Sequence, residues 1–273
     1  MGESQAPTTK EDYYLIKSVV KAINALWKLS AASRPLGATE LSAQLGYSRT
    51  VCYKLLCTLT RCGLTHLDPA SKKYTLSPKV VELASSFLES SPLVRVSFSH
   101  IRRLAEDTNM SSGLAVLWEG TALFLIDCES RARVRVRTPV GLRSPLHASS
   151  SGKCLLAFLP KQEQSEVLAS LVLEKHTSAT ITEHDVLRRE LDQVRKEGYA
   201  VNKGERVADL YGIAAPVFDS SNRLVAAASI GIPSSSISED EITDLAGMVV
   251  DAANRITEEL APYTAALSSD EAW

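Results

Sequence analysis

Two short helical patterns separated by a glycine-containing turn constrain the fold of this 273-residue chain more than any other feature. Leu41 and Leu45 have helical spacing, Thr39 is the expected N-cap, and Gly46 is expected to end this helix in a left-handed conformation. Ser48 can cap the next helix, whose buried face is expected to contain Val51, Leu55, Leu56 and Leu59. Two helices joined by such a turn form a helix-turn-helix unit.

The second helix of such a unit places its N-terminal side chains against base edges in the major groove of DNA. Arg can pair with guanine, Ser and Thr can bind bases or phosphates, and Lys neutralises phosphate. After this helix, residues 64–67 and 72–76 are expected to form a β-hairpin, the wing. The candidate DNA-binding residues are Ser48, Arg49, Thr50, Tyr53, Lys54, Lys72 and Lys73.

The charge is distributed unevenly along the chain. Residues 1–80 contain 11 Lys and Arg against 5 Asp and Glu, a balance of +6, whereas the remainder contains 19 against 27, a balance of −8. This asymmetry indicates that only the first part meets a polyanion such as double-stranded DNA. Winged helices also dock proteins, so a ligand-binding or protein-docking module that never touches DNA is the alternative.

The rest of the chain predicts an α+β fold with a largely antiparallel sheet. Strands are expected at 113–118, 121–127, 133–137, 199–201, 211–218 and 223–230, and a long final helix spans 242–260. The helix at 78–92 is expected to be a linker, whose apolar stripe either pairs with a second subunit or covers the chain's own sheet. The expected domains are a disordered tail at 1–12, a winged helix-turn-helix at 13–77, the linker helix at 78–92, an effector-binding domain at 93–265 and a tail at 266–273.

Four arginines lie close together in this second part. In the expected strand at 133–137, arginine alternates with valine, so that one face of the strand is basic. Such a face can be solvated, can contact another subunit or can bind an anion. The sequence does not decide between these roles for Arg131, Arg133, Arg135 and Arg137.

A serine-rich turn at 149–151 leads directly into an apolar helix at 153–159. Ser150, Ser151 and Gly152 place free backbone N–H groups at the helix start, where the helix dipole also favours an anion. The segment therefore predicts a pocket for a small carboxylate. Ser150 and Lys153 also fit the S-x-x-K pattern of serine hydrolases, but no SDN or KTG element follows. We therefore expect a protein that is not an enzyme, with the serine hydrolase as a distant alternative.

The cysteine pattern and the hydropathy argue against a metalloprotein, a secreted disulfide-bonded protein and a membrane protein. The five cysteines contain no CxxC pair, and Cys52, Cys57 and Cys62 step by five residues, off any common helix face. We expect no metal site, no cofactor and reduced, buried or half-buried thiols, as in the cytoplasm. The chain shows neither an apolar run of membrane-spanning length nor a signal-peptide pattern at its N-terminus.

From about Ile16 to Leu260 the chain resembles the IclR family of bacterial transcriptional regulators. The resemblance is carried by the motifs RSPLHASSSGK at 143–153, GYAV at 198–201 and IAAPVFD at 213–219. It implies an N-terminal winged helix-turn-helix, a C-terminal GAF/PAS-like domain that binds a small-molecule effector, and a homodimer that often pairs into a tetramer on operator DNA.

The resemblance also implies an effector pocket. The positions that match it are Ser144, Ser150, Ser151, Asn202, Leu210, Gly212, Ser229 and Gly231. At 202, 212, 229 and 231, family members that bind small keto acids usually carry Asp, Cys, Ser and Ser. Only Ser229 agrees, so we expect a roomier, less polar pocket for an aromatic or other bulky carboxylate instead of glyoxylate or pyruvate.

Overall fold

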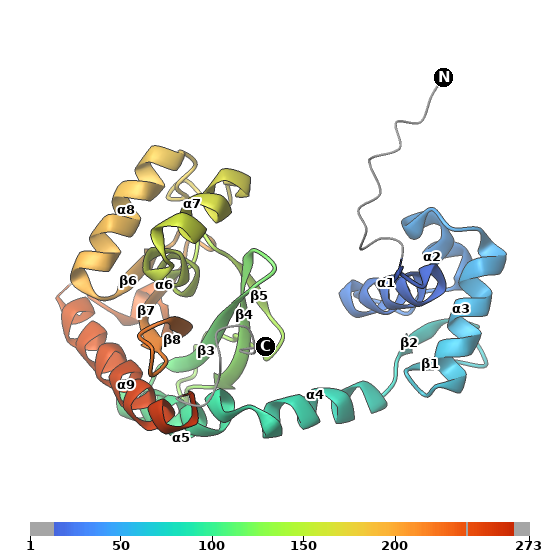
Figure 1. Ribbon diagram of the computed structural model, residues 1–273, viewed down its shortest axis with the longest axis horizontal. Coiled ribbons are helices and arrows are strands. Elements are labelled where there is room, and N and C mark those ends of the chain that lie inside the picture. Colours follow the sequence, from blue (N-terminus) through green and yellow to red (C-terminus); the bar gives the residue numbers. More distant parts are fainter. Residues whose placement is uncertain (1–13, 239, 265–273) are drawn as a thin grey trace. The chain divides into compact units, whose positions relative to one another are not determined.

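The computed structural model describes residues 14–238 and 240–264, which divide into two compact units between Phe87 and Leu88. The expected tails at 1–12 and 266–273 lie outside the described residues. The fold is α+β, as predicted, with a helical unit that carries a hairpin and a second unit built on one large sheet (Figure 1).

The N-terminal unit is a winged helix-turn-helix. Its helices are α1 (Lys17–Ala31), α2 (Ala38–Leu45) and α3 (Arg49–Arg61), and its wing is the antiparallel pair β1 (Thr65–Leu67) and β2 (Tyr74–Leu76). Gly46 ends α2 with φ +69°, in the left-handed region that glycine tolerates without steric cost. The Ser48 hydroxyl accepts the Val51 N–H at 3.3 Å and so caps α3 as predicted.

The start of α2 differs from the prediction, because Gly37 and not Thr39 is the N-cap. Glu40 compensates for the missing side-chain acceptor at Gly37. Its Oε2 accepts the Gly37 N–H at 2.7 Å, which satisfies one of the free donors at the helix start.

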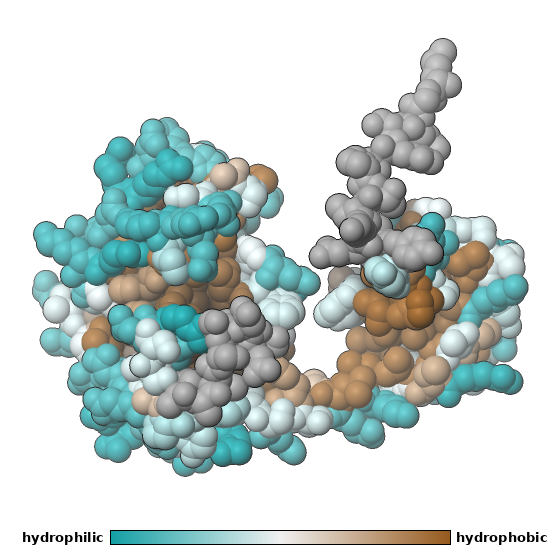
Figure 2. Space-filling view, viewed as in Figure 1, coloured by the Kyte–Doolittle hydropathy of each residue, from teal (hydrophilic) through white to brown (hydrophobic). Residues whose placement is uncertain are grey.

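The apolar residues of α1 recur at helical spacing, but most of the large ones do not face the core. The buried residues of α1 are Ala25 and Leu29, which pack against α3 residues such as Leu56. The larger apolar side chains are exposed on the opposite side, where Figure 2 shows hydrophobic surface. These exposed residues are Ile16, Val19, Val20, Ile23 and Trp27.

Helix α4 (Lys79–Ser90) connects the units and has no buried residue; Val81, Leu83 and Phe87 are exposed on it. Helix α5 (Pro92–Thr108) follows at once, because Ser91 caps it and Pro92 fits its first turn without losing a hydrogen bond. In contrast to α4, α5 buries much of its length, including Ile101 and Leu104.

The C-terminal unit is built on a six-stranded antiparallel sheet of order β5-β4-β3-β8-β7-β6. Glu119 and Gly120, both with positive φ, form the tight turn between β3 and β4, as the sequence predicts. The strands are β3 (Ser111–Trp118), β4 (Thr121–Cys128), β5 (Arg143–Pro145), β6 (Ala200–Lys203), β7 (Leu210–Phe218) and β8 (Leu224–Pro233).

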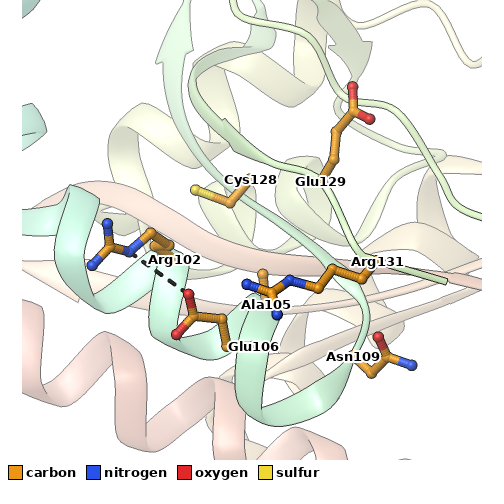
Figure 3. A pocket seen from close by; sticks show the side chains of 7 residues that line it. All are labelled: Arg102, Ala105, Glu106, Asn109, Cys128, Glu129 and Arg131. Atoms are coloured by element: carbon orange, nitrogen blue, oxygen red, sulfur yellow. Dashed lines mark ion pairs between the residues drawn. The ribbon is translucent and has the colours of Figure 1, made fainter.

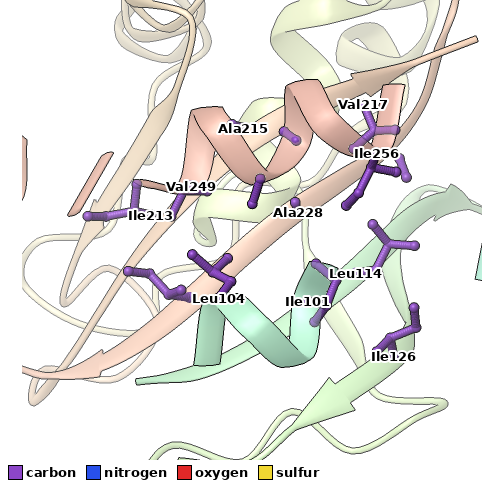
Figure 4. Close-up of a cluster of buried hydrophobic side chains, with 14 of the residues drawn as sticks. Ile101, Leu104, Leu114, Ile126, Ile213, Ala215, Val217, Ala228, Val249 and Ile256 are labelled. Carbon is purple, nitrogen blue, oxygen red and sulfur yellow. The ribbon is translucent and has the colours of Figure 1, made fainter. Parts of the chain in front are cut away.

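Helices cover both faces of this sheet. The first face carries α5 and α9 (Glu241–Thr264), and the side chains of Ile101, Val249 and Ile256 meet those of the strands there (Figure 4). The second face carries α6 (Ser150–Phe158), with α7 (Lys161–Ser170) and α8 (His184–Glu197) outside it. The strands present small side chains to α6, so this helix packs close to the sheet; they are Ala115, Ala122, Ala214 and Ala227.

The strand predicted at 133–137 is wrong. Residues 131–142 form an irregular loop, and β4 pairs with β5 in its place. Pro139 lacks the N–H that a sheet ladder needs, and Gly141 turns the chain with φ +87°. The alternating arginines and valines therefore serve other contacts, because Arg135 and Arg137 both pair with Glu129.

Candidate functional sites

A groove of about 800 Å³ in the N-terminal unit brings the start of α3 next to the wing. Five of the seven predicted DNA-binding residues line it, although the two segments are separated in sequence; these are Arg49, Thr50, Tyr53, Lys72 and Lys73. Ser48 and Lys54 are exposed at the start and on the first turns of α3 but do not line the groove. The groove can therefore offer guanidinium, hydroxyl and ammonium donors to one extended anion.

The same groove contains the carboxylate of Glu40, whose negative charge is balanced by neighbouring cationic side chains. Its Oε1 lies 2.5 Å from Arg34 Nη1 and 3.5 Å from Lys73 Nζ. The Gly37 N–H, followed by Arg34, lowers the pKa of Glu40 to about 2. Glu40 is therefore ionised near neutral pH, and it neutralises part of the charge that Lys73 would offer to a phosphate.

A second cavity, of about 280 Å³, lies at the start of α6 in the C-terminal unit. All eight residues predicted for the effector pocket line it. Ser149 caps the helix by accepting the Gly152 N–H at 3.1 Å, while its own hydroxyl donates to the Pro145 carbonyl at 2.7 Å. Ser150 and Ser151 follow as the first helical residues, whose N–H groups have no acceptor within the helix.

Two of the polar positions are engaged by the protein itself. Asn202 accepts the Glu205 N–H at 2.9 Å and donates to the Ala148 carbonyl at 3.4 Å, so its amide ties the end of β6 to the turn before α6. Ser229 donates to the Gly113 carbonyl at 3.4 Å.

Gly212 and Gly231 enlarge the cavity less than the absence of their side chains leads one to expect. A Cβ at Gly212 would lie 2.7 Å from Ser150 Oγ, and one at Gly231 would lie 2.8 Å from Val136 Cγ1. Ser150 and Val136 thus occupy the space that larger residues would fill.

Sequence reasoning missed several residues of this cavity, including Phe124, Val136, Tyr211 and Arg206. Arg206 lies in the loop after β6, and its Nη1 donates to Ser144 Oγ at 2.7 Å. No signal in the sequence links these two residues, which are separated by 62 positions. The proximity of Arg206 to Asn202, four residues earlier, was the one available hint.

Lys153 does not have the environment of a catalytic base. Its side chain is 1% exposed, and its Nζ lies 2.8 Å from Glu190 Oε1 and 2.7 Å from Glu205 Oε1. Two carboxylates stabilise its charged form, which has no lone pair to accept a proton from Ser150. His147 is likewise a buried structural residue, with Nε2 at 2.9 Å from the Glu174 carbonyl.

A third cavity, of about 310 Å³, lies between α5 and the end of β4 (Figure 3). Arg131 lines it together with Glu106, and Arg102 pairs with Glu106 at 3.9 Å. Cys128 also lines it, and burial raises the pKa of its thiol. No group of three metal-ligating side chains occurs among the described residues, and none of their helices has the length and apolarity for crossing a bilayer.

The fold and these sites define a helix-turn-helix protein with a separate ligand-binding domain, and the comparisons with known proteins agree. Residues 18–69 match the profile of the IclR helix-turn-helix domain, and residues 85–258 match that of the bacterial transcriptional regulator IclR C-terminal domain. The chain belongs to the IclR family of bacterial transcriptional regulators. This confirms the expected family and fold class.

Individual relatives support the same conclusion. The HTH-type transcriptional regulator KdgR of Escherichia coli is 31% identical over 245 residues, covering 90% of this chain and 93% of KdgR. An IclR transcriptional regulator from Alicyclobacillus acidocaldarius matches with a TM-score of 0.81 at 26% identity, covering 91% of this chain and all of that one. These relatives are regulators and not enzymes, in agreement with the expectation for this chain.

One solved relative contains a ligand. An IclR homologue from Microbacterium hydrocarbonoxydans, complexed with 4-hydroxybenzoate, matches with a TM-score of 0.77 at 25% identity. The match covers 89% of this chain and 98% of the homologue.

Proposed function

We propose that this regulator binds operator DNA through its N-terminal groove and senses a small organic acid, aromatic or otherwise bulky, in the cavity at the start of α6. The DNA-binding residues in this proposal are Ser48, Arg49, Thr50, Tyr53, Lys54, Lys72 and Lys73. The effector-binding residues are Ser144, Ser150, Ser151, Asn202, Leu210, Gly212, Ser229 and Gly231. The proposed domains are residues 13–77 and 93–265, with 78–92 as the linker.

The observation that carries the DNA-binding role is the shared groove of α3 and the wing. Recognition helix and wing contribute to it from both sides, so one duplex can meet base-reading and phosphate-binding side chains together. The test is fluorescence anisotropy with DNA from upstream of the protein's own gene. Arg49→Ala is expected to weaken binding by about 1–3 kcal/mol, whereas Arg61→Ala, on the last turn of the same helix, should have little effect.

If Arg49→Ala and Lys54→Ala both left binding to this DNA intact, the assignment of the recognition helix would be wrong. A protein that binds none of its upstream DNA at any salt concentration would favour the alternative, a docking or ligand-binding module.

The observation that carries the effector role is the free helix start inside a cavity that is also lined by apolar residues. A carboxylate can accept from the N–H groups of Ser150 and Ser151 while a ring contacts Phe124 and Ile230. The relative with bound 4-hydroxybenzoate supports an acid of this kind. The test is calorimetric titration with 4-hydroxybenzoate, benzoate, glyoxylate and pyruvate. Tight binding of glyoxylate without binding of either aromatic acid would reject the proposal.

The exposed apolar faces of α1 and α4 support a homodimer; we propose that this homodimer is cytoplasmic and that two dimers pair on DNA. The effector can change the affinity for DNA only if it binds two arrangements of the dimer with different affinities. Light scattering after size exclusion tests the assembly. Ile23→Glu and Phe87→Glu are expected to shift it towards the monomer, whereas a monomeric wild type would contradict it.

A further inference from the structure

Arg206 brings an unpaired positive charge to the effector cavity. The residue lies in the loop between β6 and β7, is half-buried and lines the cavity. One of its N–H groups, on Nη1, donates to Ser144 Oγ. No carboxylate among the described residues lies within ion-pair distance of its guanidinium.

The other cations nearby are already compensated. Arg137 also lines the cavity, but its side chain is 67% exposed and it pairs with Glu129 at 3.0 Å. Lys153, in the second turn of α6, is held by Glu190 and Glu205. The described lining of the cavity contains no Asp or Glu. Arg206 is therefore the one lining cation, in the described part of the chain, without a counter-charge.

An unpaired charge in a half-buried position is costly. Desolvation lowers the pKa of Arg206, which shows that burial opposes its charged form. Guanidinium nevertheless stays protonated in proteins, so an anion in the cavity would offset this cost. The neighbouring Ser144 favours such an anion, because its oxygen accepts from Arg206 and its own hydroxyl proton remains free to donate.

The cavity thus offers more donors than one carboxylate can use. A carboxylate has about four lone-pair sites. The start of α6 offers the N–H groups of Ser150 and Ser151 and the Ser150 hydroxyl, for which no protein partner occurs in the described residues. Arg206, in the loop after β6, and Ser144, in β5, offer a second set. The lining also contains apolar side chains, among them Phe124, Val136, Leu142, Leu210 and Ile230.

We propose that the effector is a dicarboxylate with an apolar body, one carboxylate binding the start of α6 and the other binding Arg206 and Ser144. This inference rests on the proposed effector role of the cavity and names the ligand class within it. Arg206 is then the residue that distinguishes diacids from monoacids.

The test is calorimetric titration of the full chain at neutral pH, where both carboxylates are ionised. The probes are benzoate and the 1,2-, 1,3- and 1,4-benzenedicarboxylates. At least one diacid is expected to bind tenfold or more tightly than benzoate, about 1.4 kcal/mol. Arg206→Gln should abolish this preference while changing benzoate affinity less than roughly threefold, and Arg206→Lys should retain part of it. Arg133→Gln, an exposed arginine outside the cavity lining, is the matched control and should behave as wild type.

The outcomes separate this inference from the function on which it rests. Binding of benzoate without tighter binding of any diacid overturns the dicarboxylate and leaves the proposed acid sensor standing. Binding of no acid at all overturns both. An equal loss of benzoate and diacid affinity in Arg206→Gln, accompanied by a lower Tm of the free protein, assigns Arg206 a structural role and also overturns the inference.

Discussion

Arg206 Nη1 donates to Ser144 Oγ at 2.7 Å, and this contact joins the two edges of the central sheet. Ser144 is the middle residue of β5, at one edge, and Arg206 follows β6, at the other. Strands that are five places apart in a sheet meet at their ends only when the sheet curls. Both residues line the cavity at the start of α6, so the contact within that lining depends on the curvature of the whole sheet.

The two wing lysines are expected to contribute unequally to DNA binding. Lys72 is exposed in the turn of the wing, whereas the charge of Lys73 is partly neutralised by Glu40 at 3.5 Å. Lys72→Gln should therefore lower the slope of log K against log salt by about 1, as expected for one lost phosphate contact. Lys73→Gln should lower it by less. Anisotropy titrations over a range of salt concentrations measure both slopes, and equal slopes would contradict the role of Glu40.

Gly152→Ala should destabilise the C-terminal unit. A Cβ at this position would lie 2.5 Å from the Leu146 Cα and 2.7 Å from the Pro145 carbonyl oxygen, both of them backbone atoms. Because backbone yields less than a flexible side chain, we expect a loss of about 1–3 kcal/mol in urea unfolding.

The control for this substitution is Gly247→Ala in α9, where a Cβ meets nothing within 4 Å. It should be neutral or stabilising by up to about 1 kcal/mol, because alanine favours the helix. A similar response at both glycines would show that α6 has room to move away from residues 145 and 146.

Acid should weaken the helix-turn-helix unit through Glu40. The pKa of Glu40 is about 2 in the folded protein, below its ordinary value of 4.5, so the folded state favours the ionised carboxylate. The stabilisation is present above about pH 4.5 and is lost as the pH falls towards 2. The protection factors of the α2 amides, which correct hydrogen exchange for its intrinsic pH dependence, should therefore fall on acidification in the wild type. Glu40→Gln should be less stable at neutral pH and show a smaller acid effect; an unchanged acid effect would assign it to other groups.

The cysteines should react with iodoacetamide in the order of their exposure. Cys62 is exposed, which differs from the buried or half-buried state expected for all these thiols, whereas Cys52 and Cys154 are buried. Burial also raises the pKa values of Cys52 and Cys154, so little thiolate is available there. Mass spectrometry should find Cys62 alkylated first and Cys154 only upon unfolding. Cys62→Ser should remove the fast phase, and its persistence would contradict this order.

Local signals allowed much of the fold to be predicted. The helix-turn-helix followed from Gly46 and Ser48, whose conformational preferences act within a few residues. The Glu119–Gly120 turn fixed the β3–β4 hairpin in the same way. The pocket positions came from resemblance to a family, and all eight line one cavity.

The missed features depend on contacts that are distant in sequence. Lys153 pairs with carboxylates 37 and 52 residues away, and these pairs leave no local pattern. The alternation at 133–137 resembled a strand, but Val136 fills the space beside Gly231. The large apolar residues of α1 recur at helical spacing, yet they are exposed and the small residue Ala25 lies in the core. In each case, the position of the side chain is determined by residues that pack against it from distant parts of the sequence, and the periodicity of the local sequence does not reveal them.

The buried ion pairs of Lys153 connect three segments mechanically. Lys153 belongs to α6, Glu205 to the loop that carries Arg206, and Glu190 to α8 on the outside of the domain. Breaking a buried pair leaves an uncompensated charge, so the three segments tend to shift together. We therefore expect a displacement of the Arg206 loop to be transmitted to α8 through these ion pairs. The outer surface of α8 is then expected to lie in a different position when the cavity is occupied than when it is empty. A partner molecule that binds this surface would therefore respond to the ligand.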